Sequence, residues 1–305
     1  MATDTGEDEY DYDVAVVGGG PAGSAVGVFS ARYGLGTLIF DRGRSSIGQC
    51  AHLENYLGFP GGVDAETFYE LMHDHAEEVG ATIESDLVES VEPADAGEGF
   101  VVRPQTGDPV TARRVVAATR YGGEYLRGLD DGTMYQTHEY DGETHEEFDK
   151  EYANADGTTP IEGLYIASPY AETSPQALMA AGHGARVGVS VVEAVRRERG
   201  YPDSIADYYD WVRREAERTE EWSDRDRWRD LFDSQFPDDH DLPDQRVDEL
   251  REREVDRRLD AYIPREDADQ RAEAGQRRLL SHIDDDLILD AAAEIDAERA
   301  ARTDD

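Results

Sequence analysis

Three glycines near the N-terminus have the spacing of a nucleotide-binding turn. Residues 18–23 read Gly-Gly-Gly-Pro-Ala-Gly, so Gly18, Gly20 and Gly23 satisfy the pattern G-x-G-x-x-G. In this pattern the first glycine permits a tight turn, the second lets the backbone approach a pyrophosphate, and the third lets a helix pack closely on a strand. Free N–H groups at the start of that helix then bind phosphate oxygens. The spacing therefore predicts binding of a dinucleotide.

The sequence around this turn supports that interpretation. A β-branched run at residues 13–17 precedes the glycines, residues 24–33 have helical spacing, and a second apolar run at 37–40 ends at Asp41. Strand, turn, helix and strand within about 30 residues make one β-α-β unit. A carboxylate about 20 residues after the glycines can bind ribose hydroxyls and would repel a 2′-phosphate. The alternative is a glycine-rich turn that happens to begin a helix.

Acidic residues dominate the composition of the whole chain. The 70 Asp and Glu residues oppose 30 Lys and Arg, for a formal net charge of -40, and Lys150 is the only lysine. Such a charge repels nucleic acid and anionic lipid, so we expect neither nucleic acid nor membrane as a partner. Dispersed acid with almost no lysine resembles the proteins of salt-in halophilic archaea. An acidic surface for a special partner is the alternative.

Cysteine and apolar content restrict the chemistry and the location. Cys50 is the only cysteine, which excludes an internal disulfide and a cysteine-based metal site, and we expect no metal. The sequence contains no run of 18 apolar residues, so we expect no membrane span. The N-terminus lacks the basic start and the apolar run of a signal peptide. We therefore expect a cytoplasmic protein.

The hydrophobic pattern divides the chain into three parts: an acidic tail at 1–11, a domain at 12–200 and an acidic helical region at 201–305. The predicted fold class is α/β. A Rossmann-like domain with a parallel sheet and a β-meander is followed by an α-helical C-terminal region.

Individual elements follow from local periodicity. Residues 64–79 predict a helix, residues 99–120 a β-meander, and residues 176–197 a long helix. Ile205, Tyr208, Tyr209 and Val212 follow i, i+3, i+4, i+7 and predict a further amphipathic helix.

Four stretches before residue 197 resemble, in order, the FAD domain of thioredoxin reductases. They are Gly48-Gln49 with residues 53–60, the helix at 68–76, the strand at 115–119, and residues 161–167 with 176–184. The resemblance implies bound FAD. It places Gln49 and Asn55 near the isoalloxazine ring, Gln176 and Ala177 at the flavin pyrimidine edge, and Val88 in contact with adenine.

Sixteen candidate cofactor-binding residues follow from the glycine pattern and the resemblance together. They are Gly18, Gly20, Pro21, Ala22, Gly23, Asp41, Arg42, Gly48, Gln49, Asn55, Val88, Thr119, Arg120, Ser168, Gln176 and Ala177. No catalytic residue can be assigned, although Cys50 is a weak candidate because it follows Gln49. A cysteine that fills space is the alternative.

The sequence departs from the resembled family in two ways. Residues 121–160 alone separate two matching stretches, which is too short for the family's inserted NADPH domain, and a dithiol relay needs a second cysteine. Arg120 replaces the glycine of the family's Ala-Thr-Gly, and Ser168-Pro169 replaces its Gly-Asp.

We therefore expect a FAD-binding oxidoreductase that is not a thioredoxin reductase and that uses an unknown electron donor or a small-molecule substrate. The alternative is a degenerate flavin fold that binds FAD weakly or not at all and acts through protein–protein contacts. Residues 201–305 match no known motif. They would cover the face left by the missing domain or mediate a homodimer.

Overall fold

The computed structural model describes residues 10–43, 45–94, 98–120, 122–130, 132–140, 143–170 and 176–303, without the side chains of His138, Tyr140 and Glu143. Most of the expected acidic tail, residues 1–9, lies outside the described residues. The chain divides into two compact units between Arg196 and Arg197.

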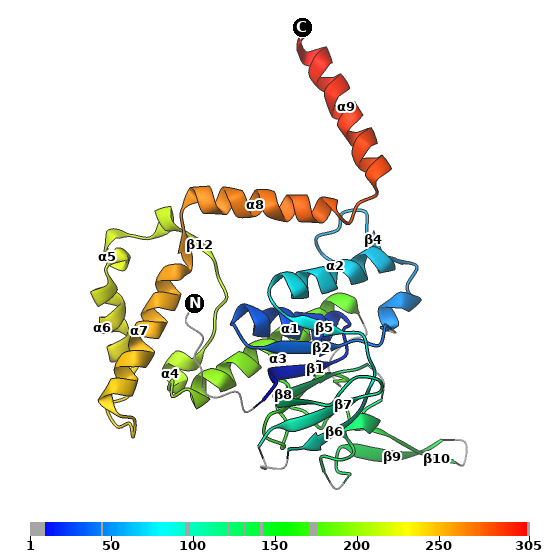
Figure 1. Ribbon diagram of the computed structural model, residues 1–305, viewed down its shortest axis with the longest axis vertical. Coiled ribbons are helices and arrows are strands. Elements are labelled where there is room, and N and C mark those ends of the chain that lie inside the picture. Colours follow the sequence, from blue (N-terminus) through cyan, green and yellow to red (C-terminus); the bar gives the residue numbers. More distant parts are fainter. Residues whose placement is uncertain are drawn as a thin grey trace. The chain divides into compact units, whose positions relative to one another are not determined.

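A seven-stranded sheet forms the centre of the first unit (Figure 1). Its strands are β1 (Tyr12–Val17), β2 (Thr37–Phe40), β5 (Thr82–Glu84), β6 (Val88–Pro93), β7 (Phe100–Pro104), β8 (Val110–Ala118) and β11 (Leu164–Ser168). Neighbours in the order β5-β2-β1-β8 are parallel, and β11 is parallel to β8. β6, β7 and the start of β8 form an antiparallel meander. The predicted fold class is confirmed.

Three helices pack on this sheet and on one another. They are α1 (Pro21–Arg32), α2 (Ala65–Glu78) and α3 (Ala177–Glu198). A Cβ added at Gly188 of α3 would lie 3.0 Å from Phe29 Cβ, so α3 packs closely on α1. Asp64 caps α2 by accepting a hydrogen bond from the Thr67 N–H at 2.8 Å, which explains why that helix begins where it does.

Shorter elements complete the first unit. They are the 3-10 helices η1 (Ser46–Gln49) and η2 (Glu124–Leu126), and the strand pairs β3 (His52–Leu53) with β4 (Val63–Asp64) and β9 (Tyr135–Tyr140) with β10 (Glu143–Phe148). The β9–β10 hairpin is the element that residues 128–160 contribute to the fold.

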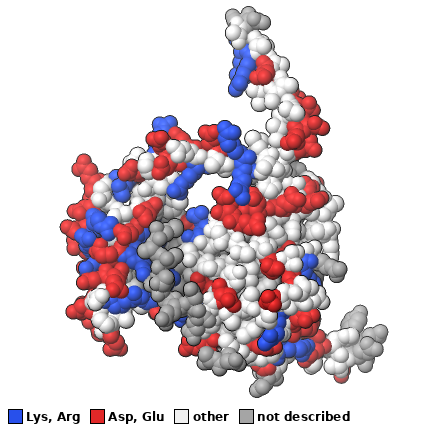
Figure 2. Space-filling view, viewed as in Figure 1, with Lys and Arg blue, Asp and Glu red and all other residues white. Residues whose placement is uncertain are grey.

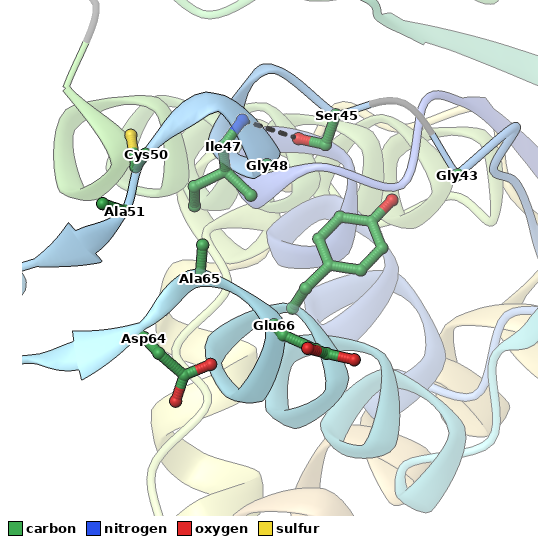
Figure 3. Close-up of a pocket in the computed structure, with 10 residues that line it drawn as sticks. Gly43, Ser45, Ile47, Gly48, Cys50, Ala51, Asp64, Ala65 and Glu66 are labelled. Atoms are coloured by element: carbon green, nitrogen blue, oxygen red, sulfur yellow. Dashed lines mark hydrogen bonds between the residues drawn. The ribbon is translucent and has the colours of Figure 1, made fainter.

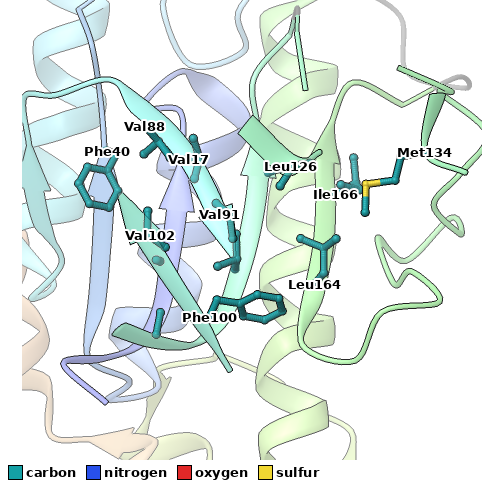
Figure 4. Close-up of a cluster of buried hydrophobic side chains, with 14 of the residues drawn as sticks. Val17, Phe40, Val88, Val91, Phe100, Val102, Leu126, Met134, Leu164 and Ile166 are labelled. Carbon is teal, nitrogen blue, oxygen red and sulfur yellow. The ribbon is translucent and has the colours of Figure 1, made fainter. Parts of the chain in front are cut away.

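A continuous apolar core joins the meander to the parallel strands (Figure 4). Val17 and Phe40 at the ends of β1 and β2 belong to it, as do Val91 and Phe100 of the meander. Leu126 of η2 is 1% exposed in the same cluster. Because burial of apolar surface is the dominant stabilising contribution, this core holds η2 and the hairpin region to the sheet.

The second unit consists mainly of helices. They are α4 (Asp203–Ala206), α5 (Glu220–Ser223), α6 (Arg225–Gln235), α7 (Asp244–Asp260), α8 (Arg265–Leu280) and α9 (Asp285–Thr303), with the short elements β12 (Arg213–Arg214), η3 (Glu215–Glu217) and β13 (Tyr262–Ile263). A small core contains Tyr201, Ile205, Phe232 and Leu250. Acidic side chains lie on both units and alternate with arginines on the second (Figure 2).

The predicted helix through residues 205–212 is wrong. α4 ends at Ala206, and Asp207 has an extended ψ of 134°. Ile205 is buried in the small core, whereas Tyr209 and Val212 are 62% and 49% exposed. A helical period over eight residues is weak evidence because tertiary contacts override local preference. Here Ile205 and Ala206 are buried in the small core within the single turn of α4, so the helix need not continue to bury them.

Candidate functional site

Within the glycine turn, residues 18–23, Gly18 and Gly23 are packed too closely to accept a side chain. Gly18 has φ +117°, and a Cβ there would lie 2.6 Å from the Ala118 carbonyl oxygen. A Cβ at Gly23 would lie 1.8 Å from the Gly18 carbonyl oxygen. α1 begins at this turn with no side-chain cap and no acidic residue in its first turn. Its first N–H groups therefore suit an anion, since the start of a helix carries a partial positive charge.

A cavity of about 1550 Å³ opens beside the glycine turn. All of the candidate cofactor-binding residues line it except Gly23 and Gly48. Gly23 is buried behind the turn, and Gly48 lines a smaller adjoining cavity of about 440 Å³. The lining includes the carboxyl ends of β1, β2, β8 and β11, or the residues just after them. Open α/β sheets bind ligands at this edge.

Asp41 already has partners from the protein. Its Oδ2 accepts a hydrogen bond from the Tyr69 hydroxyl, and its Oδ1 accepts one from the Gly43 N–H at 3.2 Å. His73 Nε2 lies 3.7 Å from Oδ2 and 2.9 Å from the carbonyl oxygen of Gly19. Burial, followed by the Asp41 carboxylate, raises the pKa of Tyr69 well above its usual range.

Tyr69 and His73 were not among the sequence candidates. They lie four residues apart on α2, and their rings pack at 4.4 Å. Their spacing on the predicted helix placed both on one face, but nothing local indicated that this face meets Asp41.

The cavity also joins candidates that are far apart in the sequence. Asn55 Nδ2 donates a hydrogen bond to Gln176 Oε1 at 2.8 Å. Ser168 lines the cavity and precedes Pro169 through a cis peptide bond. Tyr170 lines it too and stacks on His183 at 4.5 Å. The structure therefore collects the candidates from the loop after β2, the end of β11 and the start of α3 at one site.

Cys50 is exposed and lines both cavities. Figure 3 shows it beside Gly48 and Ile47, with Asp64 and Glu66 at the start of α2 on the other side of the smaller cavity. The described residues place no basic side chain in this smaller cavity that could activate the thiol.

A further wall of the large cavity comes from η2 and the β9–β10 hairpin. It contains Glu124, Tyr125, Phe148 and Lys150. None of these was a sequence candidate for the cofactor, because residues 121–160 match no motif.

Metal-binding clusters and membrane-spanning helices are both absent from the described residues. No group of three or more His, Cys, Asp or Glu side chains there could hold a metal ion. Over the same residues, no helix has the length and apolar character needed to cross a membrane.

The parallel sheet, the glycine turn and the cavity at the carboxyl ends of the strands define a unit with a Rossmann-like fold. No protein-family model matches the chain. Thioredoxin reductase from Aquifex aeolicus is 35% identical over 72 residues, covering 23% of this chain and 22% of that protein. Thioredoxin reductase from Bacillus subtilis is 34% identical over 124 residues, covering 39% of this chain and 37% of that protein.

The fold agrees with these matches. A thioredoxin reductase structure from Gloeobacter violaceus superposes with a TM-score of 0.51 at 16% identity, covering 67% of this chain and 98% of that one. The sequence matches span well under half the length of the two relatives. Part of the chain is therefore similar in sequence to thioredoxin reductases, and the chain shares the fold of a thioredoxin reductase structure.

Proposed function

We propose that the first unit binds FAD in the large cavity and that the protein is a FAD-dependent oxidoreductase. The observation that carries this proposal is the convergence of the candidate residues, chosen from separate segments of the sequence, on one cavity beside the glycine turn. The similarity to thioredoxin reductases, a family of flavoproteins, supports FAD as the dinucleotide.

The residues at the cavity fit the parts of FAD. The N-terminus of α1 suits the pyrophosphate. Asp41 Oδ1, which accepts a long hydrogen bond from the Gly43 N–H, suits a ribose hydroxyl. The Asn55–Gln176 pair offers amide groups to the flavin ring. Bound FAD would supply hydride and electron transfer, while the protein supplies binding and orientation.

Two positions that differ from the resembled family change the proposed binding in opposite directions. The resembled family has an aspartate where this chain has Pro169, and proline has no side-chain acceptor. Loss of one hydrogen bond to a charged group, about 1.5–3 kcal/mol, corresponds to roughly ten- to a hundred-fold in affinity. Arg120 lines the cavity and can recover part of this by pairing with phosphate. We therefore expect incomplete FAD occupancy that added FAD restores.

The proposed reaction is not reduction of thioredoxin. Cys50 is the only cysteine of the chain, and a dithiol relay needs two. Where the family carries its NADPH domain, the described part of residues 121–160 forms η2 and one hairpin. The flavin would therefore be reduced by an external electron donor or by a small-molecule substrate.

The alternative is a degenerate flavin fold that works through protein–protein contacts. The engagement of Asp41 by Tyr69 favours it, because a ribose hydroxyl must share the carboxylate. Ser168-Pro169 in place of Gly-Asp favours it too. This second candidate predicts a colourless protein that binds a partner chain.

The deciding experiment titrates FAD into protein freed of bound flavin, in molar KCl, and follows flavin fluorescence. We expect saturable quenching in the parent and none in Gly20→Val, because a side chain at Gly20 blocks the approach of the backbone to phosphate. Gly182→Ala is the matched control, since no described atom lies within 4 Å of its added Cβ. If the parent shows no response and Gly20→Val behaves the same, the degenerate fold is the correct alternative.

A parent that binds FAD can then be tested for its electron donor. The absorbance spectrum of the FAD-loaded protein is recorded with NADH, with NADPH and with dithionite. Bleaching by dithionite alone supports a donor or substrate other than a nicotinamide.

A further inference from the structure

Lys150 is the only lysine of the chain, and it lines the large cavity. The other 29 of the 30 Lys and Arg residues are arginines. Arginine serves the surface ion pairs of this protein, as Arg225 and Arg229 do with Glu252 at 3.0 and 2.6 Å. A primary amine differs from a guanidinium because it is a compact charge with three rotatable donors. The single lysine therefore places a compact ammonium charge at the cavity, where the rest of the chain uses guanidinium groups.

Lys150 has no acidic partner in the part of this strongly acidic protein that the structure describes. Among the described residues it has no ion pair or hydrogen bond, although 70 acidic residues are present in the chain. The two carboxylates on the same wall have other interactions. Glu124 accepts a hydrogen bond from the Gly123 N–H at 2.9 Å, and Glu147 has a contact of its own. An exposed ammonium beside a cavity, with no carboxylate partner, is free for an anion from outside.

The wall that carries Lys150 is held in place by several contacts. The Tyr135 hydroxyl donates to the Gly123 carbonyl at 2.6 Å, and Arg127 pairs with Glu146 at 2.6 Å. These contacts join the hairpin to the η2 segment. A Cβ at Gly123 would lie 2.7 Å from the Phe148 ring, so the two segments are closely packed. Lys150 therefore directly follows a hairpin that these contacts hold against the η2 segment.

The wall that contains Lys150 also contributes aromatic side chains to the cavity. Phe148 is 7% exposed and lines the cavity, with its ring edge-on to Tyr135 at 6.0 Å and to Tyr152 at 6.2 Å. Tyr125 lines the cavity as well, and its hydroxyl lies 3.1 Å from Thr119 Oγ1. Apolar rings beside one ammonium group suit a ligand with an apolar body and a single negative end.

We propose that Lys150, Phe148 and Tyr125 form the substrate subsite of the proposed flavoenzyme and that it takes a small carboxylate with an aromatic or apolar body. The subsite lies on the β8 side of the glycine turn, whereas Arg42, which suits the cofactor, follows β2 on the other side. The cavity, at about 1550 Å³, exceeds the roughly 300–1,000 Å³ of single small-ligand sites. The residues that suit the cofactor and the wall that carries Lys150 therefore line one and the same cavity. This inference rests on the proposed binding of FAD.

The test uses the full chain loaded with FAD, at the lowest KCl concentration that keeps it folded. Benzoate is the probe because it has an aromatic ring and one carboxylate, and benzamide is its neutral control. Lys150 is the only side-chain amine, so trinitrobenzenesulfonate followed by peptide mass spectrometry reports on Lys150 separately from the N-terminal amine. Changes in flavin absorbance give the benzoate affinity independently.

We expect benzoate, but not benzamide, to protect Lys150 from labelling and to shift the flavin spectrum. Lys150→Met should weaken benzoate about tenfold or more, as expected for loss of a hydrogen bond to a charged group, and Lys150→Arg should restore part of it. Both variants should bind FAD within twofold of the parent. Arg265→Met removes one positive charge at a side chain that is 93% exposed in the second unit and should change neither affinity.

Three results would overturn the proposal. Labelling of Lys150 that benzoate does not slow, or unchanged benzoate affinity in Lys150→Met, would show that the amine does not bind the carboxylate. Loss of FAD itself in Lys150→Met would assign the amine to the cofactor. Failure of the proposed function is a different result, because then the parent takes up no FAD before any benzoate is added.

Discussion

Replacement of Gly184 by alanine tests how closely α3 packs on the helix that starts at the glycine turn. An added Cβ at Gly184 would lie 2.1 Å from the carbonyl oxygen of Ala22 and 2.7 Å from its Cα. Both atoms are backbone in the first turn of α1, so no side-chain rotation relieves the overlap. α1 or α3 must move instead.

The magnitude follows from two opposing contributions. Overpacking a core position costs typically about 1–3 kcal/mol, and overlap with backbone places this site at or above the upper end. Alanine stabilises a helix by about 1 kcal/mol relative to glycine. The net loss is therefore about 2 kcal/mol or more. At roughly 2–4 °C per kcal/mol for a domain of this size, the Tm should fall by about 4–8 °C.

Gly182→Ala provides the matched control two residues earlier in the same helix. No described atom lies within 4 Å of its added Cβ, so only the gain in helix propensity remains. Its Tm should rise by about 2–4 °C. Far-UV circular dichroism melts of both variants in one KCl buffer make the comparison. If Gly184→Ala melts at or above the parent, the close contact between α1 and α3 does not exist and the reasoning is refuted.

Further predictions concern salt, nicotinamide, the altered flavin contacts and acid. The net charge of -40 repels itself over a Debye length of roughly 30 Å at 0.01 M salt, so the thermal midpoint should rise strongly in molar KCl; equal melts in both buffers would contradict this. Calorimetry of the FAD-loaded protein should detect no low-micromolar NADPH site, because the chain has one dinucleotide motif. Ser168→Gly combined with Pro169→Asp should tighten FAD about tenfold in the fluorescence titration, and an unchanged affinity would show that this position does not contact the cofactor. Hydrogen bonds from Arg229 and, to a smaller extent, Arg225 lower the pKa of Glu252 from 4.5 to about 2. The ionised Glu252 carboxylate therefore stabilises the fold fully above about pH 4.5, and this stabilisation is lost as the pH falls through about 2. Glu252→Gln should therefore destabilise the second unit at pH 7 by about 1 kcal/mol at most, as for exposed ion pairs, and should make no difference at pH 2.

Local patterns predicted the elements that depend on neighbours in sequence. The runs at 13–17 and 37–40 form β1 and β2, and the helix predicted at 64–79 is α2, Ala65–Glu78. Gly23, which the glycine pattern predicted to allow close packing of a helix on a strand, would place an added Cβ 1.8 Å from the Gly18 carbonyl oxygen. These predictions succeeded because buried strands, helix faces and closely packed glycines each need particular residue types at regular spacings in the sequence.

The stripe at residues 205–212 shows where such reasoning fails. Its period suits a helix, yet the chain leaves α4 at Ala206 because Ile205 is already buried against the second unit's own core. The choice between a helix and an extended segment was made by packing partners far away in the sequence, such as Phe232 and Leu250.

The sequence by itself determined the dinucleotide motif, the acidic composition and the fold class, because each depends only on residue types and on short spacings between them. Only the tertiary structure decided that Asp41 shares its carboxylate with Tyr69 of α2, and that the hairpin region places Lys150 on the wall of the same cavity. Both arrangements join segments separated by long stretches of chain. Their geometry depends on how the sheet, α2 and η2 pack together, and no local pattern records that packing.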